Sequence, residues 1–322
     1  MYAAVLHTLG KPPRFDQFPE PAAGEGEVIV HVRAAALKPV DKAMARGEHY
    51  ASFRELPAVC GVDGAGHIEN GSRVVFAGPR RPYGAMAQRA PVARARCFPV
   101  PDGVDDETAA ALLNPGMSAW FALTWRAQLS QGERVLILGA TGVAGKLAVQ
   151  IARRLGAGRV VAAGRNEHLL STLGALGADA TIRLDQPGQD LTDVFAREAG
   201  DAGFDVVIDF LWGRPTEALL AAFTRSDLTA ARSRVRLVEV GESAGPVISL
   251  PAAALRSTKL EILGSGSGAV PPLDVIVDSY HQLMARAATG ELRVATERVA
   301  LADVEDAWQR QNLQGRRLVV IP

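Results

Sequence analysis

The segment that most constrains the fold is an apolar strand, Val135–Leu138, that runs directly into the glycine-rich turn Gly139-Ala-Thr-Gly-Val-Ala-Gly145. The turn opens a helix with one apolar face. That face is formed by Leu147, Ala148, Ile151, Ala152 and Leu155. A strand followed by such a turn at a helix N-terminus is typical of dinucleotide binding, because unpaired N–H groups and the positive helix end meet the pyrophosphate. The alternative, a tight turn without a ligand, is disfavoured by the flanking strands.

Apolar strands and amphipathic helices alternate beyond this turn. The expected elements are a helix at 143–155, a strand at 159–163, a helix at 167–176 and a strand at 204–210. A strand–helix–strand order with short connections predicts a doubly wound parallel sheet. We therefore assign the chain to the α/β class.

The first third of the chain has a different pattern, with short alternating runs such as 27–33 and 73–77 that predict antiparallel strands. Two helices are expected at the crossing to the second pattern, one from Asp105 or Asp106 to Leu113 and one around 120–129. The chain ends in a further set of elements, which we expect to return to the first domain. They are a helix at 273–288, a strand at 296–301, a helix at 304–311 and a strand at 317–321.

Composition excludes several classes of function. The 35 Lys and Arg residues balance the 35 Asp and Glu residues, which argues against nucleic acid as a partner. No apolar run reaches the roughly 20 residues that a membrane helix needs, and no signal pattern precedes the first strand, so we expect a cytoplasmic protein without a membrane partner. Two cysteines, Cys60 and Cys97, lack metal-binding or disulfide spacing.

The residues at the end of the next strand, Ala163-Gly-Arg-Asn166, indicate whether the cofactor is NADPH or NADH. An acidic residue at this place binds the ribose hydroxyls of NAD. Arg165 instead offers a planar guanidinium to a 2′-phosphate, which favours NADPH. Glu167 lies close enough in sequence to keep NADH as the alternative, and a solvated Arg165 is the other reading.

The whole chain resembles the medium-chain dehydrogenase/reductase superfamily, specifically its zinc-free quinone oxidoreductase branch. The resemblance rests on the glycine-rich turn and on four further segments. These are Ala36-Leu-Lys-Pro-Val-Asp41, Arg46-Gly-Glu-His-Tyr50, Leu56-Pro-Ala-Val-Cys-Gly-Val-Asp-Gly-Ala-Gly66 and Pro101-Asp-Gly103 with Asp106-Glu-Thr-Ala-Ala-Ala111. It implies a Rossmann domain at 113–266 and a GroES-like β-rich substrate domain formed by 1–112 with 267–322.

Zinc-dependent members of this family carry a Gly-His-Glu segment where this chain reads Gly61-Val62-Asp63. With valine in the histidine position and no cysteine in the segment 37–41, a tetrahedral zinc site cannot be built from the matching residues. The resemblance thus implies hydride transfer from NADPH to an already polarised substrate, a quinone or the activated C=C of an enone, without zinc.

The resemblance also implies the cofactor-binding residues, with the nicotinamide in a cleft between the domains. They are Asn114, Ser118, Ala140, Thr141, Gly142, Val143, Ala144, Gly164, Arg165, Asn166, Phe210, Leu211, Val240, Gly241, Ser265, Gly266 and Ser267. Ala140 replaces the first glycine of the common fingerprint.

Three residues are candidates for catalysis. Tyr50 matches a tyrosine that recurs beside the substrate in this branch and is either a proton donor or a half-buried loop aromatic. Lys38 stands where relatives usually have asparagine, and is either directed at a substrate carbonyl or solvated. Asp41 is expected to pair with Lys38 or Arg46, chiefly in a structural role, and Cys60 is expected to be a buried thiol.

The strand at 261–263 matches an edge that pairs two subunits in many relatives, so we expect a homodimer. Two alternatives to the quinone or enone reductase stay open. One is a pathway-specific reductase of an enoyl thioester or enone, for which the pair Arg80-Arg81 hints at a basic rim. The other is an NADPH-binding protein with little catalysis.

Overall fold

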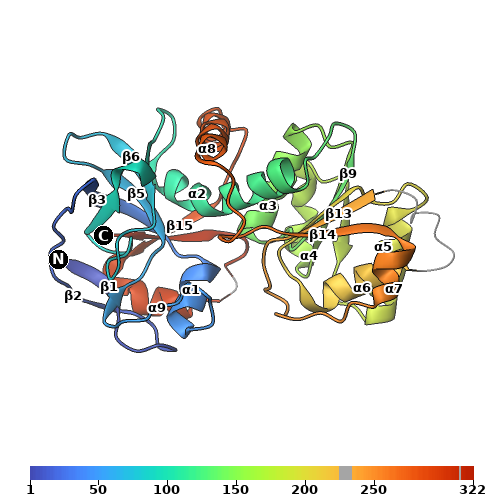
Figure 1. Ribbon diagram of the computed structural model, residues 1–322, viewed down its shortest axis with the longest axis horizontal. Helices are drawn as coiled ribbons and strands as arrows, with labels where there is room; N and C mark the ends of the chain where they lie inside the picture. Colours follow the sequence, from blue (N-terminus) through green and yellow to red (C-terminus); the bar gives the residue numbers. More distant parts are fainter. Residues whose placement is uncertain (225–233, 312) are drawn as a thin grey trace. The chain divides into compact units, whose positions relative to one another are not determined.

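The computed structural model describes residues 1–224, 234–311 and 313–322, and the chain divides into two compact units (Figure 1). Unit 1 comprises Met1–Asn114 and Tyr280–Pro322, and unit 2 comprises Pro115–Ser279. The first division lies close to the domain limit expected at 112. The second lies inside the helix α8 (Leu273–Ala288) and not ahead of it at 266.

Unit 1 is built from β-strands that form two sheets. The strands are β1 (Tyr2–Leu6), β2 (Arg14–Gln17), β3 (Glu27–Ala36), β4 (Ala58–Val59), β5 (Asp63–His67), β6 (Arg73–Ala77), β7 (Arg89–Ala93), β8 (Cys97–Pro99), β15 (Thr296–Ala300) and β16 (Arg317–Ile321). The larger sheet has the order β15-β16-β3-β5-β6-β8, with β7 also paired to β3, and the smaller has the order β2-β1-β4. Besides the first part of α2 (Asp106–Phe121) and the last part of α8, the helical segments are α1 (Pro39–Arg46), η1 (Arg94–Arg96), η5 (Leu301–Asp303) and α9 (Val304–Gln309).

The end of the chain completes the core of unit 1. Strand β16 pairs antiparallel with β3, with Val319 opposite Ala36 and Val320 opposite Ala35. Leu318 and Trp308 are buried in the same cluster as residues of the first third. The expected return of the C-terminal elements to the first domain is therefore confirmed.

Unit 2 contains the predicted parallel sheet. Its strands are β9 (Arg134–Leu138), β10 (Arg159–Gly164), β11 (Ala180–Arg183), β12 (Val206–Asp209), β13 (Arg234–Glu239) and β14 (Lys259–Gly264), in the order β11-β10-β9-β12-β13-β14. All five pairings are parallel. The chain leaves β9 toward one edge and then continues from β12 toward the other, so the strand order reverses between β9 and β12. Ligands of doubly wound sheets bind at such a reversal, beside the carboxyl ends of the strands.

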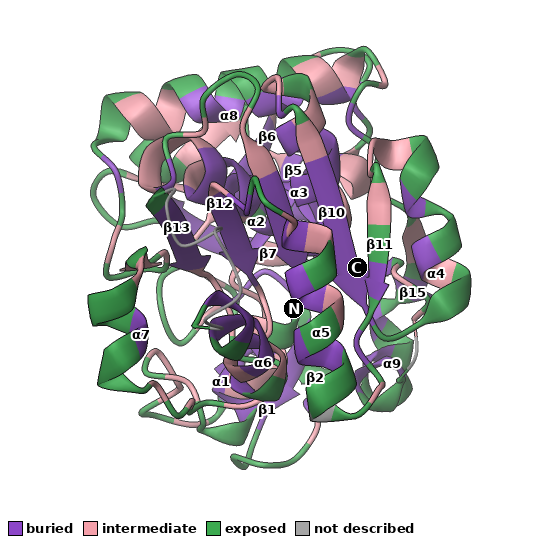
Figure 2. Ribbon diagram, turned by 90° about the vertical axis from the view of Figure 1, so that its right-hand side faces the viewer, coloured by how far each residue is buried: buried purple, intermediate pink, exposed green. Residues whose placement is uncertain are grey.

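Helices cover both faces of this sheet, as Figure 2 shows for the buried strands behind α5 and α6. The helical segments are α3 (Val143–Arg154), α4 (Glu167–Ser171), η3 (Leu173–Leu176), α5 (Gly188–Ala199), α6 (Gly213–Phe223) and α7 (Ala252–Ser257). Leu191 and Phe195 of α5 and Leu219 of α6 pack with Leu136 and Val207 of the sheet. Helix α3 buries its predicted stripe, except that Leu155 is only partly covered.

Two helix predictions were wrong in detail. The two helices expected on either side of Pro115 are one helix, α2 (Asp106–Phe121), that continues as the π-helical segment η2 (Ala122–Arg126). A proline removes one backbone hydrogen bond, but closely packed flanking turns compensate, as burial of Leu112 and Ala119 shows. The helix expected at 167–176 is interrupted, because α4 ends at Ser171 and a 3₁₀ turn follows.

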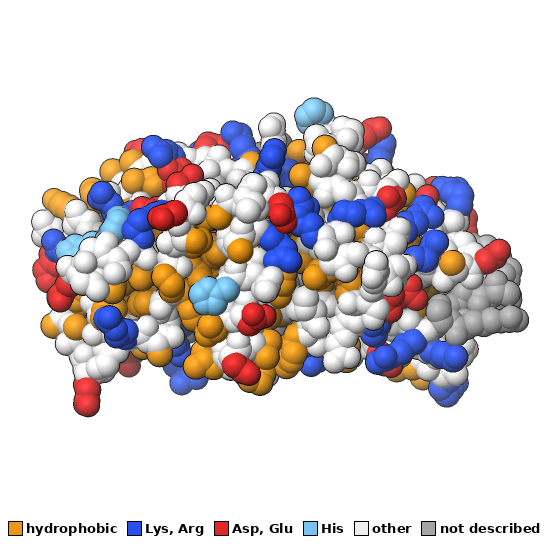
Figure 3. Space-filling view, turned by 90° about the horizontal axis from the view of Figure 1, so that it is seen from above, with side chains coloured by type: hydrophobic (Ala, Val, Ile, Leu, Met, Phe, Trp, Pro, Cys, Tyr) orange, Lys and Arg blue, Asp and Glu red, His pale blue; other side chains and the backbone are white. Residues whose placement is uncertain are grey.

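The surface and the helix lengths agree with the composition. Side chains of both charges occur over the face of the molecule in Figure 3, as the equal numbers of acidic and basic residues require. Among the described residues, no helix is long and apolar enough to span a bilayer.

Candidate functional site

The glycine-rich turn lies at the carboxyl end of β9, as predicted. A Cβ atom at Gly145 would lie 2.2 Å from the Gly139 carbonyl oxygen and 2.6 Å from the Ala140 Cα, so only glycine lets α3 pack on the turn. Ala140 is fully buried, and its N–H donates to the Ala163 carbonyl at 2.8 Å. This hydrogen bond fixes the turn to the neighbouring strand β10, so alanine is accommodated in place of the first fingerprint glycine.

The N-terminus of α3 is open on the side of the turn. Gly142 is its N-cap residue and contributes no side-chain cap. A Cβ atom at Gly142 would meet only the Gly139 carbonyl oxygen, at 3.4 Å. The first N–H groups of a helix have no acceptor in a preceding turn, so those of Val143 and Ala144 are directed toward this open side. The residues present therefore fit the pyrophosphate of a dinucleotide.

The ends of β9, β12 and β13 meet around this turn. A Cβ atom at Gly139 would lie 3.1 Å from Leu211 Cδ2 and 3.3 Å from Phe210 Cβ. At the end of β13, the N–H groups of Val240 and Gly241 donate to the Asp209 carbonyl at 2.8 and 3.2 Å. The glycine-rich turn and the loop after β12 are about 70 positions apart in the sequence. The structure brings them together at one edge of the sheet, as expected of parallel strands.

Ser265 extends this edge to β14, because its N–H donates to the Glu239 carbonyl at 2.8 Å. Gly266 and Ser267 follow and are exposed. Asn114 and Ser118 lie four residues apart on α2 and so share a helix face. Their contact with a cofactor stays a prediction.

Asp209 is a site residue that the sequence analysis missed. Its side chain is buried, accepts N–H bonds from Leu211 and Trp212 at 2.8 and 2.9 Å, and accepts the Thr216 hydroxyl at 2.5 Å. Burial raises the pKa of Asp209, and these hydrogen bonds lower it in part. The carboxylate holds the loop after β12 in place. The only sequence signal was an acidic residue that ends an apolar strand.

Arg165 and Asn166 follow β10 at the tip of the same edge. Arg165 is exposed, and no carboxylate of the described residues lies within 4 Å of it. Asn166 caps α4, because its side-chain oxygen accepts the Leu169 N–H at 3.0 Å. Glu167, the residue that kept NADH as an alternative, is ion-paired with Arg183 at 3.4 Å.

Thr141 and Gly164 are adjacent across β9 and β10. A Cβ atom at Gly164 would lie 2.6 Å from Thr141 Cγ2, so the Thr141 side chain covers the backbone of Gly164. Two of the predicted cofactor-binding residues therefore form one continuous surface beside Arg165.

Lys38 lies in a different environment from either expectation. Its side chain is 1% exposed, so a solvated lysine is wrong. The ammonium donates to Asp63 Oδ1 at 2.6 Å and to the Ala36 carbonyl at 2.6 Å, and lies 3.6 Å from Asp41 Oδ2. These partners occupy the charge of Lys38 inside unit 1, which leaves no role for it in direct contact with a substrate carbonyl.

Asp41 pairs with Lys38, as one of the two expectations had it, and not with Arg46, which binds Glu48 at 2.6 Å. Its carboxylate also caps α1 by accepting the Lys38 N–H at 2.8 Å, and it accepts the Val62 N–H at 3.0 Å. Asp41 therefore joins the start of α1 to the segment before β5.

Asp63 and Arg317 complete a buried group of four charges that sums to zero, which we call the charge tetrad (Lys38, Asp41, Asp63 and Arg317). Burial raises the pKa of Asp63, although Lys38 opposes this effect. Burial disfavours the charged form of Arg317 as well, and so lowers its pKa. The Arg317 guanidinium donates to the Leu37 carbonyl at 2.9 Å. Sequence analysis noted Asp63 without a role and missed Arg317, which is 254 positions further along the chain.

The two remaining candidates are placed apart from the tetrad. Cys60 is fully buried, as expected, and burial raises the pKa of its thiol. Tyr50 is 76% exposed, with its ring 3.9 Å from that of His49. The expectation of a half-buried loop aromatic is therefore wrong, and a role as proton donor stays a prediction.

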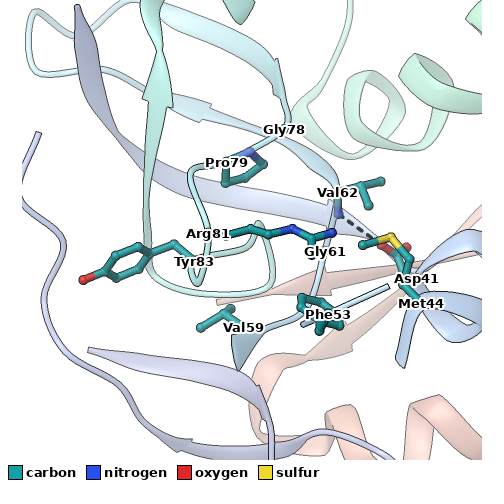
Figure 4. A pocket seen from close by; sticks show the side chains of 10 residues that line it. All are labelled: Asp41, Met44, Phe53, Val59, Gly61, Val62, Gly78, Pro79, Arg81 and Tyr83. Atoms are coloured by element: carbon teal, nitrogen blue, oxygen red, sulfur yellow. Dashed lines mark hydrogen bonds between the residues drawn. The ribbon is translucent and has the colours of Figure 1, made fainter. Parts of the chain in front are cut away.

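A pocket of about 90 Å³ opens beside Asp41 in unit 1 (Figure 4). It is lined by Asp41, Met44, Phe53, Val59, Gly61, Val62, Gly78, Pro79, Arg81 and Tyr83. Gly61 forms part of its wall at φ +103°, and a Cβ atom there would lie 2.7 Å from the Met86 nitrogen. The segment before β5 must therefore keep glycine at this position.

The donor set near Val62 does not fit zinc. Asp63 is held by the Lys38 ammonium, and Val62 offers no ligand atom. In the part of the chain that the structure describes, no three His, Cys, Asp or Glu side chains gather as a metal site. Tetrahedral zinc needs at least three such ligands, so we derive no chemical step through a metal.

Comparisons with known proteins agree with this geometry. The family described as alcohol dehydrogenase GroES-like domain matches residues 24–102, and the family described as zinc-binding dehydrogenase matches residues 144–288. A probable NADPH-dependent quinone reductase of Emericella nidulans is 26% identical, with both chains covered completely. An NADPH-dependent alkenal/one oxidoreductase of Arabidopsis thaliana is 29% identical over 58% of this chain, which spans about half (51%) of that relative.

Solved structures give the same result over the full length. The quinone oxidoreductase of Thermus thermophilus, which was also crystallised with NADPH, has a TM-score of 0.81 and 28% identity, with both chains covered completely. Two family matches, a full-length relative and a full-length structural neighbour thus agree with the Rossmann and GroES-like architecture. The chain belongs to the medium-chain dehydrogenase/reductase superfamily, in its quinone oxidoreductase-like branch.

Proposed function

We propose that the protein is a zinc-independent, NADPH-dependent reductase that transfers hydride to a quinone or to the activated C=C of an enone. The observation that carries this proposal is the open helix N-terminus at Gly142, beside the reversal of strand order between β9 and β12. The full-length relative and the structural neighbour, both of which are NADPH proteins by name, support it.

The residues after β10 favour NADPH over NADH. Arg165 is exposed at the strand end, and no carboxylate of the described residues lies within 4 Å of it, although Asp185 is close enough to interact with it electrostatically. Its guanidinium is therefore available to a 2′-phosphate. Glu167 is engaged by Arg183 and would compete less for the ribose hydroxyls. When bound, the dihydronicotinamide would supply hydride and one proton would be taken up. NADPH and H⁺ would then reduce a quinone to a hydroquinone, or an enone to a saturated ketone, with NADP⁺ as the other product.

The charge tetrad supports the proposal that the enzyme works without zinc. The Lys38 ammonium supplies inside unit 1 the positive charge that neutralises Asp63. A zinc ion at the same place would have to displace this ammonium and would find no histidine. Without a Lewis acid to stabilise an alkoxide, a substrate that conjugation has already polarised suits the site better than a simple alcohol.

We propose that solvent protonates the product, with Tyr50 as the alternative donor. Tyr50 is mostly exposed and so retains contact with water, whereas a proton donor must lie within hydrogen-bond reach of the reacting group. Lys38 stands where relatives usually have asparagine, but its pairing with Asp63 gives it a structural role, so it is no argument for a binding protein with little catalysis. We therefore prefer the enzyme.

We also propose a homodimer in the cytoplasm. Strand β14 pairs only with β13 in the described sheet, so its other edge is available to a second copy. A two-fold axis perpendicular to β14 would pair this edge with its copy and join the two sheets into one.

The function is tested by NADPH oxidation in the presence of a chelator, with naphthoquinones, enones and crotonyl thioesters as substrates and NADH in parallel. We expect turnover of quinones or enones with a preference for NADPH. Tight NADPH binding without turnover would instead support the binding-protein alternative, and turnover of thioesters alone would support the pathway-specific reductase.

A further inference from the structure

The pocket beside Asp41 is lined by one further charged side chain, that of Arg81. Arg81 crosses the pocket between Pro79 and Phe53, with its guanidinium directed toward the Gly61–Val62 segment (Figure 4). Its contacts are to neutral groups. It donates to the Ser52 carbonyl at 3.0 Å and to the Ala51 carbonyl, and it lies 5.1 Å from the centre of the Phe53 ring.

The acidic residue of the pocket, Asp41, belongs to the charge tetrad, whose four charges sum to zero. Both Asp41 oxygens accept backbone N–H groups, and the Lys38 ammonium lies 3.6 Å from Oδ2. No carboxylate of the described residues lies within 4 Å of Arg81, whereas the adjacent Arg80 is paired with Glu27 at 3.0 Å. The pocket therefore carries a net positive charge, from Arg81 alone.

The geometry points to a subsite for an anionic oxygen group, and we propose that Arg81 binds a carboxylate or phosphate of the substrate there. A guanidinium has five N–H donors in a planar fork, and two of them are used by the Ala51 and Ser52 carbonyls. Those two bonds and the Phe53 ring fix the orientation of the fork, so a bidentate partner loses little side-chain freedom on binding.

The size and walls of the pocket limit what accompanies the anionic group. About 90 Å³ is less than the roughly 150 Å³ cavity that accepts benzene, so a bicyclic quinone does not fit inside it. Met44, Phe53, Val59 and Pro79 form apolar walls, which suit a short carbon chain. The substrate class is thus an unsaturated carbonyl compound with an anionic end, and the pocket takes that end with the short carbon chain next to it.

This inference rests on the proposed function in taking the ligand to be the substrate, but its test does not need turnover. Binding of butyrate, butyl phosphate and butyramide to the full chain is measured by ligand-observed NMR without cofactor. We expect one of the anions to bind at least about fivefold more tightly than neutral butyramide, since charge-assisted bonds are the stronger ones and solvent screens part of the gain. Whichever anion binds identifies the source of the charge.

Variants separate the subsite from general charge effects. The Arg81→Met substitution should remove the preference for the anion, and Arg81→Lys should retain part of it, because the charge stays while the planar fork is lost. The Arg80→Met substitution removes a neighbouring charge outside the pocket and should leave the preference intact. Far-UV circular dichroism and Tm show whether each variant folds.

The proposal is overturned if no anion is preferred over butyramide, or if the preference survives in folded Arg81→Met. A kinetic measurement distinguishes it from failure of the reductase itself. In the wild type, kcat/KM for 4-oxo-2-pentenoate should exceed that for its methyl ester by at least about fivefold. Anion binding without any reduction would contradict the proposed function and leave the subsite standing.

Discussion

Lys38→Met is the substitution whose effect the structure defines most closely. The ammonium is buried, lies 2.6 Å from Asp63 Oδ1 and balances one of the two carboxylates in the charge tetrad. Methionine keeps most of the side-chain volume and removes the charge. The tetrad then has a net charge of −1 among buried groups, and the Asp63 carboxylate and the Ala36 carbonyl lose a hydrogen-bond donor.

Removal of one partner of a buried ion pair costs about 3–5 kcal/mol in the free energy of unfolding. In a domain of about 150–250 residues, each kcal/mol lowers Tm by about 2–4 °C. The expected loss for Lys38→Met at pH 7.5 is therefore roughly 6–20 °C. Lys42→Met is the matched control, because Lys42 lies one turn further along α1 and its ammonium donates at 3.3 Å to the Arg310 carbonyl in an exposed contact. We expect it to change stability by less than about 0.5 kcal/mol.

The pH dependence of this loss gives a sharper test. Burial already raises the pKa of Asp63 in the wild type, and loss of Lys38 must raise it further. A carboxyl group whose folded pKa exceeds its unfolded pKa contributes stability at pH values below the unfolded pKa, and this contribution is lost as pH rises through the folded pKa. The difference between Lys38→Met and the wild type should therefore be larger at pH 7.5 than at pH 5, where the variant's Asp63 is protonated to a greater extent.

Urea denaturation of both variants at the two pH values measures these differences. The double variant Lys38→Met with Asp63→Asn restores a tetrad of zero net charge, so it should be more stable at pH 7.5 than Lys38→Met alone. The reasoning is refuted if the single variant loses less than about 1 kcal/mol, or if the loss does not depend on pH.

Three further outcomes are expected. Gly145→Ala should lower stability by about 1–3 kcal/mol, because its Cβ would lie 2.2 Å from the Gly139 carbonyl oxygen, whereas Gly142→Ala should keep the wild-type Tm and weaken NADPH binding in a fluorescence titration. Arg165→Ala should raise KM for NADPH by about 5–30-fold with little change in KM for NADH. An equal rise for both cofactors would show that Arg165 does not bind the 2′-phosphate. Tyr50→Phe should change kcat by less than about threefold, while a loss of about a hundredfold would identify Tyr50 as the proton donor.

The sequence predicted those parts of the fold that local patterns determine. The strand at Val135–Leu138, the turn after it and the stripe of α3 could be predicted because an apolar strand, three glycines and helical spacing agree over one short segment. The interruption expected between the helix that ends at Leu113 and the one around 120–129 was wrong for the opposite reason. Proline predicts a break from local geometry, whereas packing of the buried turns on either side of it keeps α2 continuous.

The cofactor-binding part of the candidate site could be predicted, because neighbouring parallel strands bring their predicted ends together. The charge tetrad could not, because Arg317 reaches Leu37 through the pairing of β16 with β3, which joins opposite ends of the chain. Burial of Lys38 likewise depends on Asp63, which is 25 positions away. Lysine side chains are mostly exposed in folded proteins, so the burial of Lys38 is explained only by the partners that the fold brings to it.

The central claim is hydride transfer from NADPH to a conjugated carbon without a metal. The most direct test uses NADPH that carries deuterium on the transferring face of C4, a short enone and excess chelator, with the product analysed by mass spectrometry and NMR. We predict one deuterium atom at the β-carbon of the saturated ketone, with one NADPH consumed for each product molecule. A protein that binds NADPH but yields no deuterated product with enones or quinones, or yields it only after zinc is added, would contradict the account.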